Sequence, residues 1–370
     1  MAGLQSRRRR GTGLKVLEPL READPRNIGG FRLTGRLGQG AMGVVYLGYR
    51  STRPVAVKVI KAALADDPYF RARFAQELEA IRRVGGFHTA ALVDADANAG
   101  QPWIATEYVH APSLLSLIEE HGAVSELGAW WLAAGLADAL MHIHSVRLLH
   151  RDLKPSNVLV AGDGVRVIDF GISHVGGATG LTTADAALGT LAYMAPEQAK
   201  DSRKASEAAD VYSLGATLVQ AMTGHPPFHA QVAAQRTLDV APDLSGMPRG
   251  RLYDLVTHTL AYEAEDRPTA HDVLEEAMER LLEEGMPTDS QAYPPLPKAF
   301  LTDVLERQTA PLDPPTATPS LPAPPAPRRP ERRPLTQTPA ADPAIPPQQD
   351  DPWSERWRGR INKRRGDYGG

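Results

Sequence analysis

The chain has 370 residues, with 41 Lys and Arg against 44 Asp and Glu and a formal net charge of −3 at neutral pH. A charge this close to neutral gives no reason to expect a nucleic-acid partner. The absence of cysteine excludes disulfides, thiolate catalysis and cysteine-ligated metal centres. No apolar run reaches the roughly 18 residues that a membrane-spanning helix needs. The composition therefore predicts a protein of the reducing cytoplasm.

The chain begins with a basic segment, MAGLQSRRRRGTG, that lacks the apolar core of a secretory signal. We predict a flexible basic arm over residues 1–30. The first motif follows at residues 36–48, RLGQGAMGVVYLG, where three glycines have the spacing G-x-G-x-x-G. Two unrelated structures use this spacing to hold a nucleotide: the dinucleotide-binding βαβ unit and the glycine-rich hairpin that covers ATP phosphates.

The residues after the third glycine distinguish these two structures. In a dinucleotide-binding unit the glycines open a helix, whose N-terminus holds the pyrophosphate. Here Gly43 is followed by VVYL, and β-branched and aromatic residues favour a strand. Asp66 and Asp67 lie where a ribose-binding acid would fall, but they precede Pro68 and a helical pattern, so helix capping is the simpler interpretation. The glycine loop is therefore predicted to join two strands.

The next two segments contain a lysine and a glutamate that we expect to meet. Lys58 is the one charge in the β-rich run VAVKVI, which follows the glycine-rich hairpin. The helix after it has a buried stripe formed by Phe70, Phe74, Leu78 and Ile81. Glu77 shares this inward face, whereas Glu79 points away from it. Because a buried acid needs a cation, we predict that Glu77 pairs with Lys58.

The strongest motifs are LLHRDLKPSNVLV at residues 148–160 and VIDFGIS at residues 167–173. Together with GQGAMGVV, VAVK, MAPE, DVYSLG and DRPT in the same order, they make the chain resemble the eukaryotic-type serine/threonine protein kinases of bacteria, in particular actinobacterial members. The resemblance covers about residues 31–284. It implies an α+β, two-lobed protein kinase fold: a small antiparallel β-sheet lobe with one key helix over about 31–108, and a larger, mainly α-helical lobe over about 109–284.

The resemblance also implies roles for the residues of the catalytic loop. Phosphoryl transfer depends on positioning and on neutralising triphosphate charge. Asp152 would orient the attacking hydroxyl and accept its proton, and Lys154 would neutralise the γ-phosphate. Asn157 and Asp169 would ligate Mg²⁺, for which Mn²⁺ is a substitute, because such cations prefer hard oxygen ligands.

The ATP site would lie between the two lobes. Lys58, aligned by Glu77, would hold the α- and β-phosphates, and the glycines would let backbone amides approach them. Thr106 would lie at the back of the adenine pocket. The residues that the resemblance places at ATP are Leu37, Gly38, Gln39, Gly40, Ala41, Met42, Gly43, Val45, Ala56, Lys58, Glu77, Thr106, Glu107, Val109 and Leu159.

Other residues match positions with structural roles in the family. Asp210 of DVYSLG would brace the backbone of the catalytic loop, and Glu197 and Arg267 would form a buried ion pair. An internal apolar stack would contain Ile81, His150 and Phe170.

The segment between DFG and MAPE is expected to regulate activity. Because Arg151 precedes Asp152, the chain resembles kinases in which a phosphate on this segment pairs with that arginine. Thr190 matches the threonine that bonds the catalytic aspartate, and Leu191 stands where the family usually has proline, which affects only the expected docking of substrate. The candidate autophosphorylation sites are Thr182, Thr183 and, third, Thr179.

The C-terminal part has a different composition. Nineteen of the 32 prolines fall between residues 287 and 352, so we predict a disordered, proline-rich tail over 285–352. Residues 353–370, WSERWRGRINKRRGDYGG, form a basic segment with apolar residues four apart. An amphipathic helix that contacts an anionic membrane surface is one interpretation. We favour a solvated basic end, because Gly359 weakens a helix.

The sequence thus predicts a cytoplasmic, ATP- and Mg²⁺-dependent serine/threonine protein kinase that acts on proteins and forms a transient homodimer for autophosphorylation. The alternative is a pseudokinase that scaffolds partners. It is disfavoured because every residue that the chemistry needs is present: Lys58, Glu77, Asp152, Asn157 and Asp169. A small-molecule kinase is disfavoured by the MAPE segment, and a nicotinamide oxidoreductase by the strand after Gly43.

Overall fold

The computed structural model describes residues 17–171, 191–228, 241–286, 294–310 and 312. All of these belong to the first of two compact units, residues 1–316. The second unit, residues 317–370, lies outside the described part of the chain, as do most of the predicted proline-rich tail and the whole basic C-terminal segment.

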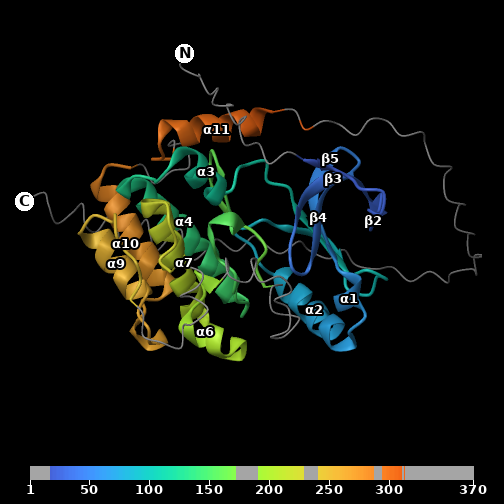
Figure 1. The fold of residues 1–370 in the computed structure, drawn as a ribbon, viewed down its shortest axis with the longest axis horizontal. Coiled ribbons are helices and arrows are strands. Elements are labelled where there is room, and N and C mark those ends of the chain that lie inside the picture. The colour runs from blue at the N-terminus through green and yellow to red at the C-terminus, as the bar shows by residue number, and fades with distance from the viewer. Residues whose placement is uncertain (1–16, 172–190, 229–240, 287–293, 311, 313–370) are drawn as a thin grey trace, which may run out of the picture. The chain divides into compact units, whose positions relative to one another are not determined.

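The N-terminal part of the described chain is an antiparallel sheet with the strand order β1-β3-β4-β5-β7-β6, in which β2 also pairs with β3 (Figure 1). The strands are β1 (Glu18–Pro19), β2 (Asn27–Ile28), β3 (Phe31–Gln39), β4 (Gly43–Arg50), β5 (Arg53–Ile60), β6 (Leu92–Asp96) and β7 (Trp103–Glu107). The glycine-rich motif connects β3 to β4, which confirms the predicted hairpin.

One face of this sheet has its own apolar core, which includes Phe31, Tyr46, Val57 and Trp103. Leu20 and Ile28 pack against this core, and β1 and β2 extend the sheet beside β3. The expectation of a flexible arm up to residue 30 is therefore wrong for residues 17–30. The basic run at the start of the chain does not continue into this segment, whose apolar residues cover the sheet.

Helices α1 (Ala62–Ala65) and α2 (Pro68–Ile81) lie between β5 and β6. Asp67 is the N-cap of α2, and its carboxylate accepts a hydrogen bond from the amide of Tyr69. Pro68 occupies the first helical position, where its missing N–H costs nothing. The four apolar residues of the predicted stripe, Phe70, Phe74, Leu78 and Ile81, are all buried. Both the helix and its capping aspartate are therefore confirmed.

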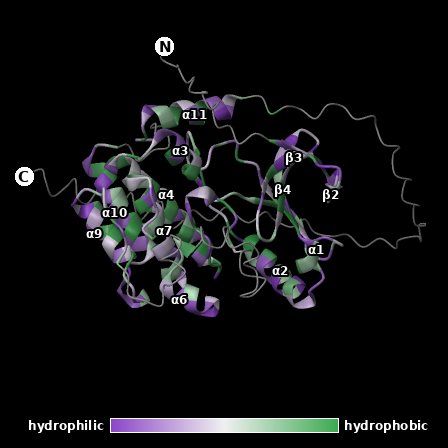
Figure 2. Cartoon of the chain, in the orientation of Figure 1, coloured by the Kyte–Doolittle hydropathy of each residue, from purple (hydrophilic) through white to green (hydrophobic). Residues whose placement is uncertain are grey.

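The remaining elements are mainly helical. They are α3 (Leu114–His121), α4 (Glu126–Ser145), the short hairpin β8 (Val158–Ala161) and β9 (Gly164–Val167), α6 (Pro196–Lys200), α7 (Glu207–Thr223), α9 (Arg251–Thr259), α10 (Ala270–Glu283) and α11 (Lys298–Thr309), with 3₁₀ turns at Pro155–Asn157, Ser202–Lys204 and Ala264–Asp266. Helix α4 packs against both α7 and α10. Along α10, hydrophobic positions alternate with hydrophilic ones (Figure 2), and the buried ones include Val273, Ala277 and Leu281. The predicted α+β fold, an antiparallel sheet part followed by a helical part, is confirmed.

Helix α11 falls inside the segment for which the sequence predicts disorder, and that expectation is wrong for residues 298–309. Phe300 and Val304 are four residues apart on α11 and almost fully buried. Helix α11 packs against α3 and β8. Five of these twelve residues are apolar, but the prolines on both sides dominate the composition of the wider segment and mask this short helical pattern.

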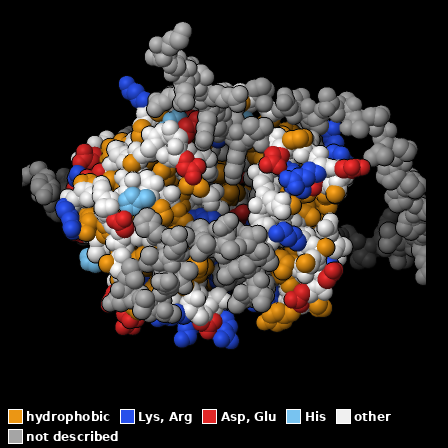
Figure 3. All heavy atoms as spheres, viewed as in Figure 1, with side chains coloured by type: hydrophobic (Ala, Val, Ile, Leu, Met, Phe, Trp, Pro, Cys, Tyr) orange, Lys and Arg blue, Asp and Glu red, His pale blue; other side chains and the backbone are white. Residues whose placement is uncertain are grey.

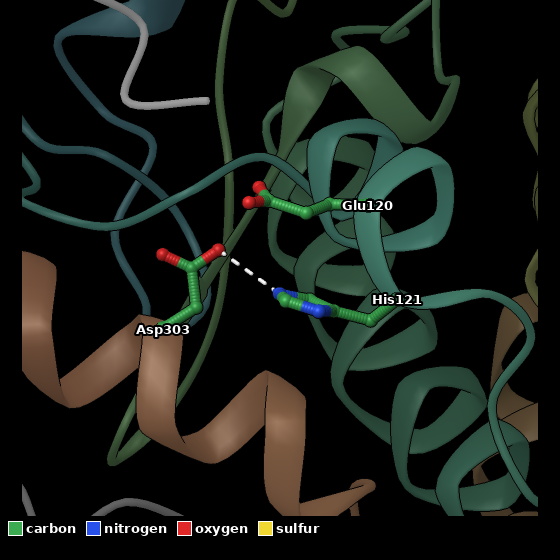
Figure 4. A group of neighbouring side chains, drawn as sticks. All are labelled: Glu120, His121 and Asp303. Atoms are coloured by element: carbon green, nitrogen blue, oxygen red, sulfur yellow. Dashed lines mark hydrogen bonds and ion pairs between the residues drawn. The ribbon is translucent and has the colours of Figure 1, made fainter. Parts of the chain in front are cut away.

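A group of polar side chains also joins α11 to α3. Glu120 and His121 of α3 and Asp303 of α11 point toward one another, with His121 Nε2 3.3 Å from an Asp303 oxygen (Figure 4). The Arg307 guanidinium donates to Asp303 at 2.6 Å and lies 3.6 Å from Glu120. Although the three groups are close enough to ligate a metal ion, Arg307 already supplies the compensating positive charge. We therefore interpret the cluster as an ion-pair network between two helices.

Among the described residues no helix is long and apolar enough to span a membrane. On the face shown in Figure 3, Lys and Arg side chains are interspersed with Asp and Glu side chains.

Candidate active site

The residues of HRDLKPSN lie between α4 and β8, and Asp210 of α7 fixes their backbone. Its carboxylate accepts hydrogen bonds from the amides of His150, at 2.8 Å, and Arg151, at 2.7 Å. His144 donates to the same carboxylate at 2.8 Å. Although burial alone would raise the pKa of Asp210, these hydrogen bonds and the nearby histidines hold the pKa below its ordinary value. The predicted bracing of the catalytic loop by Asp210 is thus present.

His144 was not predicted to have this role. His142 and His144 are two residues apart on α4, and side chains at that spacing do not face one ligand together. In the structure only His144 is buried, and it contacts Asp210. A buried acid on α7 was expected, but no pattern in the sequence identified this histidine as its partner.

Asp152 is held by two neighbours of the same loop. Lys154 Nζ lies 2.8 and 3.0 Å from the two carboxylate oxygens of Asp152. Asn157 Nδ2 donates to the backbone oxygen of Asp152 at 2.8 Å and to its carboxylate at 3.1 Å. The structure therefore brings these three predicted residues into one hydrogen-bonded group, in which the Asp152 carboxylate has a fixed orientation.

Asp169 follows β9 and has the left-handed backbone angle φ = +63°, which is uncommon outside glycine. Its side chain is about one-third exposed, and one carboxylate oxygen lies 3.1 Å from Lys58 Nζ. Phe170, the next residue, is buried, with its ring edge-on to that of His150. Ile81 is also buried, in the same apolar core as Phe170. Strained backbone of this kind clusters at functional sites.

The predicted pairing of Lys58 with Glu77 is wrong for this structure. Lys58 pairs with Asp169, and Glu77 instead lies 3.6 Å from Nη1 of Arg151. Within the described part of the chain, Glu77 Oε2 and Arg151 Nε are buried and have no hydrogen-bond partner. Burial raises the pKa of Glu77 to about 7, against the attraction of Arg151 and Arg73. The requirement of a buried acid for a cation was predicted correctly, but the cation that pairs with Glu77 is Arg151 and not Lys58.

Glu77 and Arg151 also border a cavity of about 310 Å³ between α2 and the start of the catalytic loop. Two further arginines line it, Arg73 of α2 and Arg147, which follows α4. Three guanidinium groups around one cavity favour an anion. The sequence identified only Arg151, because Arg73 and Arg147 are far apart in the chain and belong to no motif.

The glycines of the β3–β4 loop have different surroundings. A Cβ atom on Gly43 would lie 2.1 Å from the backbone oxygen of Val59, so no other residue fits there without a backbone shift. A Cβ atom on Gly38 or Gly40 would meet nothing within 4 Å among the described residues. At these two positions the absence of a side chain leaves open space, as the approach of a phosphate requires. Met42 packs partly against the larger apolar core.

The residues expected around the adenine come from strands β3, β4, β5, β7 and β8 and from the segment after β7. Ala56 on β5 pairs across the sheet with Thr106 on β7, and Val45 on β4 pairs with Lys58. The predicted residues Leu37, Val45, Ala56, Thr106, Val109 and Leu159 are all half-buried, whereas Glu107 is exposed. Leu159 on β8 forms an isolated bridge to Ser113. Partial burial is what residues that line an open site show.

The predicted buried ion pair is present. Arg267 donates to the two carboxylate oxygens of Glu197 at 2.7 and 2.9 Å, and its side chain is fully buried. Next to it, Gln198 donates to the backbone oxygen of Arg151 at 2.8 Å, which links α6 to the catalytic loop. The sequence did not identify this second contact.

The candidate phosphorylation sites and the threonine expected near Asp152 lie outside the described residues. They are Thr179, Thr182, Thr183 and Thr190. Their roles stay predictions.

Comparisons with known proteins agree with this geometry. Residues 31–278 match the protein kinase domain family. The chain is 48% identical over 287 residues to serine/threonine-protein kinase AfsK of Streptomyces coelicolor, covering 76% of this chain and 36% of that protein. It is 45% identical over 264 residues to the probable serine/threonine-protein kinase PkwA of Thermomonospora curvata, covering 70% of this chain and 35% of that protein.

The alignments thus span only about a third of the length of these relatives. Among solved structures, the kinase domain of Mycobacterium tuberculosis PknI is 29% identical, with a TM-score of 0.57, over 70% of this chain and all of that chain. The matched region contains strands β3 to β7 of the sheet, the glycine-rich hairpin, the catalytic loop and Asp169. This chain belongs to the protein kinase domain family.

Proposed function

We propose that the protein is a serine/threonine kinase that transfers the γ-phosphate of ATP to serine and threonine hydroxyls of proteins. The observation that carries the proposal is the group formed by Asp152, Lys154 and Asn157, next to the DFG aspartate. Its carboxylate is oriented by two hydrogen-bonded neighbours, as a group that must meet a hydroxyl requires. The relatives named serine/threonine-protein kinases support the acceptor class.

Asp152 orients the acceptor hydroxyl and takes its proton, and the ammonium of Lys154 offsets negative charge that develops beside it. Asn157 and Asp169 hold the divalent cation, Mg²⁺ or in its place Mn²⁺. Because the Asn157 nitrogen is engaged by Asp152, its amide oxygen is the donor it offers to a cation, and Asp169 adds a partly exposed carboxylate. When bound, the cation neutralises phosphate charge.

We further propose that the half-buried residues around β4, β5, β7 and β8 hold the adenine ring. The Glu107 amide already donates to the Ala91 oxygen, and the Val109 oxygen accepts from Ala111. The adenine edge would therefore meet the Glu107 oxygen and the Val109 amide. Lys58 would bind the α- and β-phosphates once it leaves Asp169.

Activity requires that Glu77 exchange Arg151 for Lys58, and we propose that a phosphate on the activation loop drives this exchange. The cavity beside Glu77 has three arginines for such an anion. Thr182, Thr183 and Thr179 are the proposed autophosphorylation sites, modified within a transient homodimer. An anion bound to Arg151 would pair with its guanidinium in place of Glu77. Glu77 would then need another cation, and we propose that this cation is Lys58.

We propose a cytoplasmic location, with protein substrates and no nucleic-acid partner. For the basic segment at residues 353–370 we favour a solvated end over contact with a membrane surface.

Transfer of labelled phosphate to a generic protein acceptor, with ATP and Mg²⁺, tests the function. Asp152→Asn should reduce transfer by about a hundredfold or more, because a positioned base contributes at least that factor. Asp163→Asn is the matched control, since Asp163 is exposed and pairs with the nearby Arg166 at a turn. If neither the wild type nor the control transfers phosphate, the protein is a scaffold.

Mass spectrometry of the same proteins tests activation. Phosphate on the three threonines should appear in the wild type and in Asp163→Asn but not in Asp152→Asn. Phosphate at these sites in Asp152→Asn as well would contradict autophosphorylation.

A further inference from the structure

Asp24 is a buried charge with four hydrogen bonds, and it lies before the region that matches the kinase family. Its side chain is about 5% exposed. One carboxylate oxygen accepts from the Arg21 amide and from Arg36 Nε, each at 2.7 Å. The other accepts from Arg36 Nη2 at 2.7 Å and from the Tyr46 hydroxyl at 2.8 Å. The arginine fork and the hydroxyl hold the pKa of Asp24 well below its ordinary range.

The partners of Asp24 are located at the base of the glycine-rich loop. Arg36 on β3 and Tyr46 on β4 are opposite each other in the sheet, and both are buried. The next cross-strand pair toward the loop is Gly38 with Val45, after an irregularity that leaves Leu37 without a register partner. Asp24 therefore bonds to both strands of the hairpin at the last pair before the strand irregularity.

A further contact leads from this group into the loop itself. Arg36 uses Nε and Nη2 on Asp24, and its remaining nitrogen, Nη1, donates to the side-chain oxygen of Gln39 at 3.3 Å. Gln39 lies between Gly38 and Gly40 and is exposed. Because the guanidinium is planar, fixing two of its nitrogens on Asp24 fixes the direction of the third.

A buried ion pair adds little net free energy to folding, because desolvation of both charges offsets most of their attraction. The Arg36–Asp24 pair is nevertheless almost fully buried, which gives the hairpin a defined geometry. We propose that Asp24 is a positioning residue for ATP binding, which sets the position of the glycine-rich loop through Arg36 and Gln39. This inference rests on the proposed kinase function, because it concerns the same nucleotide site.

The test uses the full-length protein, with KM for ATP, kcat and the thermal midpoint measured for each variant. Asp24→Asn leaves the Arg36 guanidinium buried without its anion, so both the KM and the midpoint should change. We expect KM to rise about tenfold, as the loss of a charge-assisted hydrogen bond would give. Asp24→Glu keeps the charge and should recover part of the loss.

A combined variant separates positioning from stability. Asp24→Leu with Arg36→Met and Tyr46→Phe replaces the whole polar group by apolar side chains of similar volume, which restores stability in other buried ion pairs. Its thermal midpoint should approach that of the wild type while KM for ATP stays raised. A wild-type KM in this variant, with the fold intact, would overturn the proposal.

Gln39→Ala removes the contact between Arg36 and the glycine-rich loop without altering the buried side chains of Asp24, Arg36 and Tyr46. Gln39 is exposed, so the midpoint should not change, whereas KM should rise and the rise should not add to that of the combined variant. If KM is unchanged in Gln39→Ala, the proposal is wrong, even where the combined variant does not fold. Asp94→Asn is the control, since Asp94 pairs with Arg50 on the exposed part of the same sheet. No transfer by the wild type would instead refute the kinase function itself.

Discussion

Glu77 provides the sharpest test of the ion-pair arrangement in this structure. Its side chain is about 15% exposed and lies 3.6 Å from Arg151, and burial raises its pKa from the ordinary 4.5 to about 7. Each unit of pKa corresponds to about 1.4 kcal/mol, so ionising Glu77 in the folded protein costs about 3 kcal/mol more than in the unfolded chain. Glu77→Gln removes this cost, because the amide does not ionise.

The direction in which stability changes with pH follows from the raised pKa of Glu77. At low pH Glu77 is protonated in both states, and the folded protein keeps its full stability. As the pH rises through 4.5 and then 7, the unfolded chain ionises first, so the wild type loses stability over this window. Glu77→Gln should not show the loss. The free energy of unfolding of the variant, relative to the wild type, should therefore grow by about 3 kcal/mol between about pH 4 and pH 8.

Urea denaturation of both proteins across this pH range measures the difference. Glu79→Gln is the matched control, because Glu79 lies on the same helix with its side chain 77% exposed. It should follow the wild type at every pH. Parallel curves for Glu77→Gln and the wild type would refute the assignment of a raised pKa to Glu77. Phosphate transfer by Glu77→Gln should fall in the same preparations, since the proposed partner of Lys58 is absent.

Three other substitutions, one of them with a control, test the hairpin, helix α11 and the catalytic loop. Gly43→Ala places a Cβ atom against the backbone oxygen of Val59, so we expect KM for ATP to rise as the hairpin shifts, measured by initial rates. Phe300→Ala should lower the unfolding free energy by about 3–5 kcal/mol in urea denaturation, whereas Leu305→Ala, on the exposed side of α11, should change it by less than about 0.5 kcal/mol. Asp210→Asn removes the charge that orders the catalytic loop and should lower stability by about 3 kcal/mol and kcat with it, as thermal unfolding and rate assays would show.

Local signals predicted much of the N-terminal part. Helix α2 begins at Pro68 after its N-cap Asp67, and its four predicted apolar residues are buried. Both features were predictable because a cap and a 3.6-residue period are properties of the segment alone. The hairpin around the glycines followed from the β-branched residues after Gly43. The pair between Glu197 and Arg267, 70 residues apart, was predicted only through resemblance to a family.

The partner of Glu77 shows where prediction from the sequence ends. An acid on the buried face of α2 requires a cation, and this much follows from periodicity. Which cation it contacts depends on the position of α2 relative to Lys58 and Arg151. The observed pair with Arg151 and the proposed pair with Lys58 use the same glutamate. No pattern within the segment distinguishes them, because they differ in tertiary position only.

The two ordered segments outside the matched family region were missed because the composition of the wider segments, basic at the N-terminus and rich in proline toward the C-terminus, outweighed their few apolar residues. Residues 17–30 and α11 each use an aspartate–arginine fork, Asp24 with Arg36 and Asp303 with Arg307. Charged residues usually mark exposed chain, so a pattern of hydropathy assigns such positions to the surface. Here both arginines are more than nine-tenths buried.

Each fork also contacts a further residue of the matched family region. Arg36 extends from Asp24 to Gln39 in the glycine-rich loop. Arg307 extends from Asp303 to Glu120 of α3, at 3.6 Å. A nonspecific apolar contact would hold these segments without fixing their orientation. A bidentate arginine–carboxylate pair allows only one relative orientation of its two groups. The bidentate pairs of Asp24 with Arg36 and of Asp303 with Arg307 therefore give the segment before β3 and helix α11 a defined orientation.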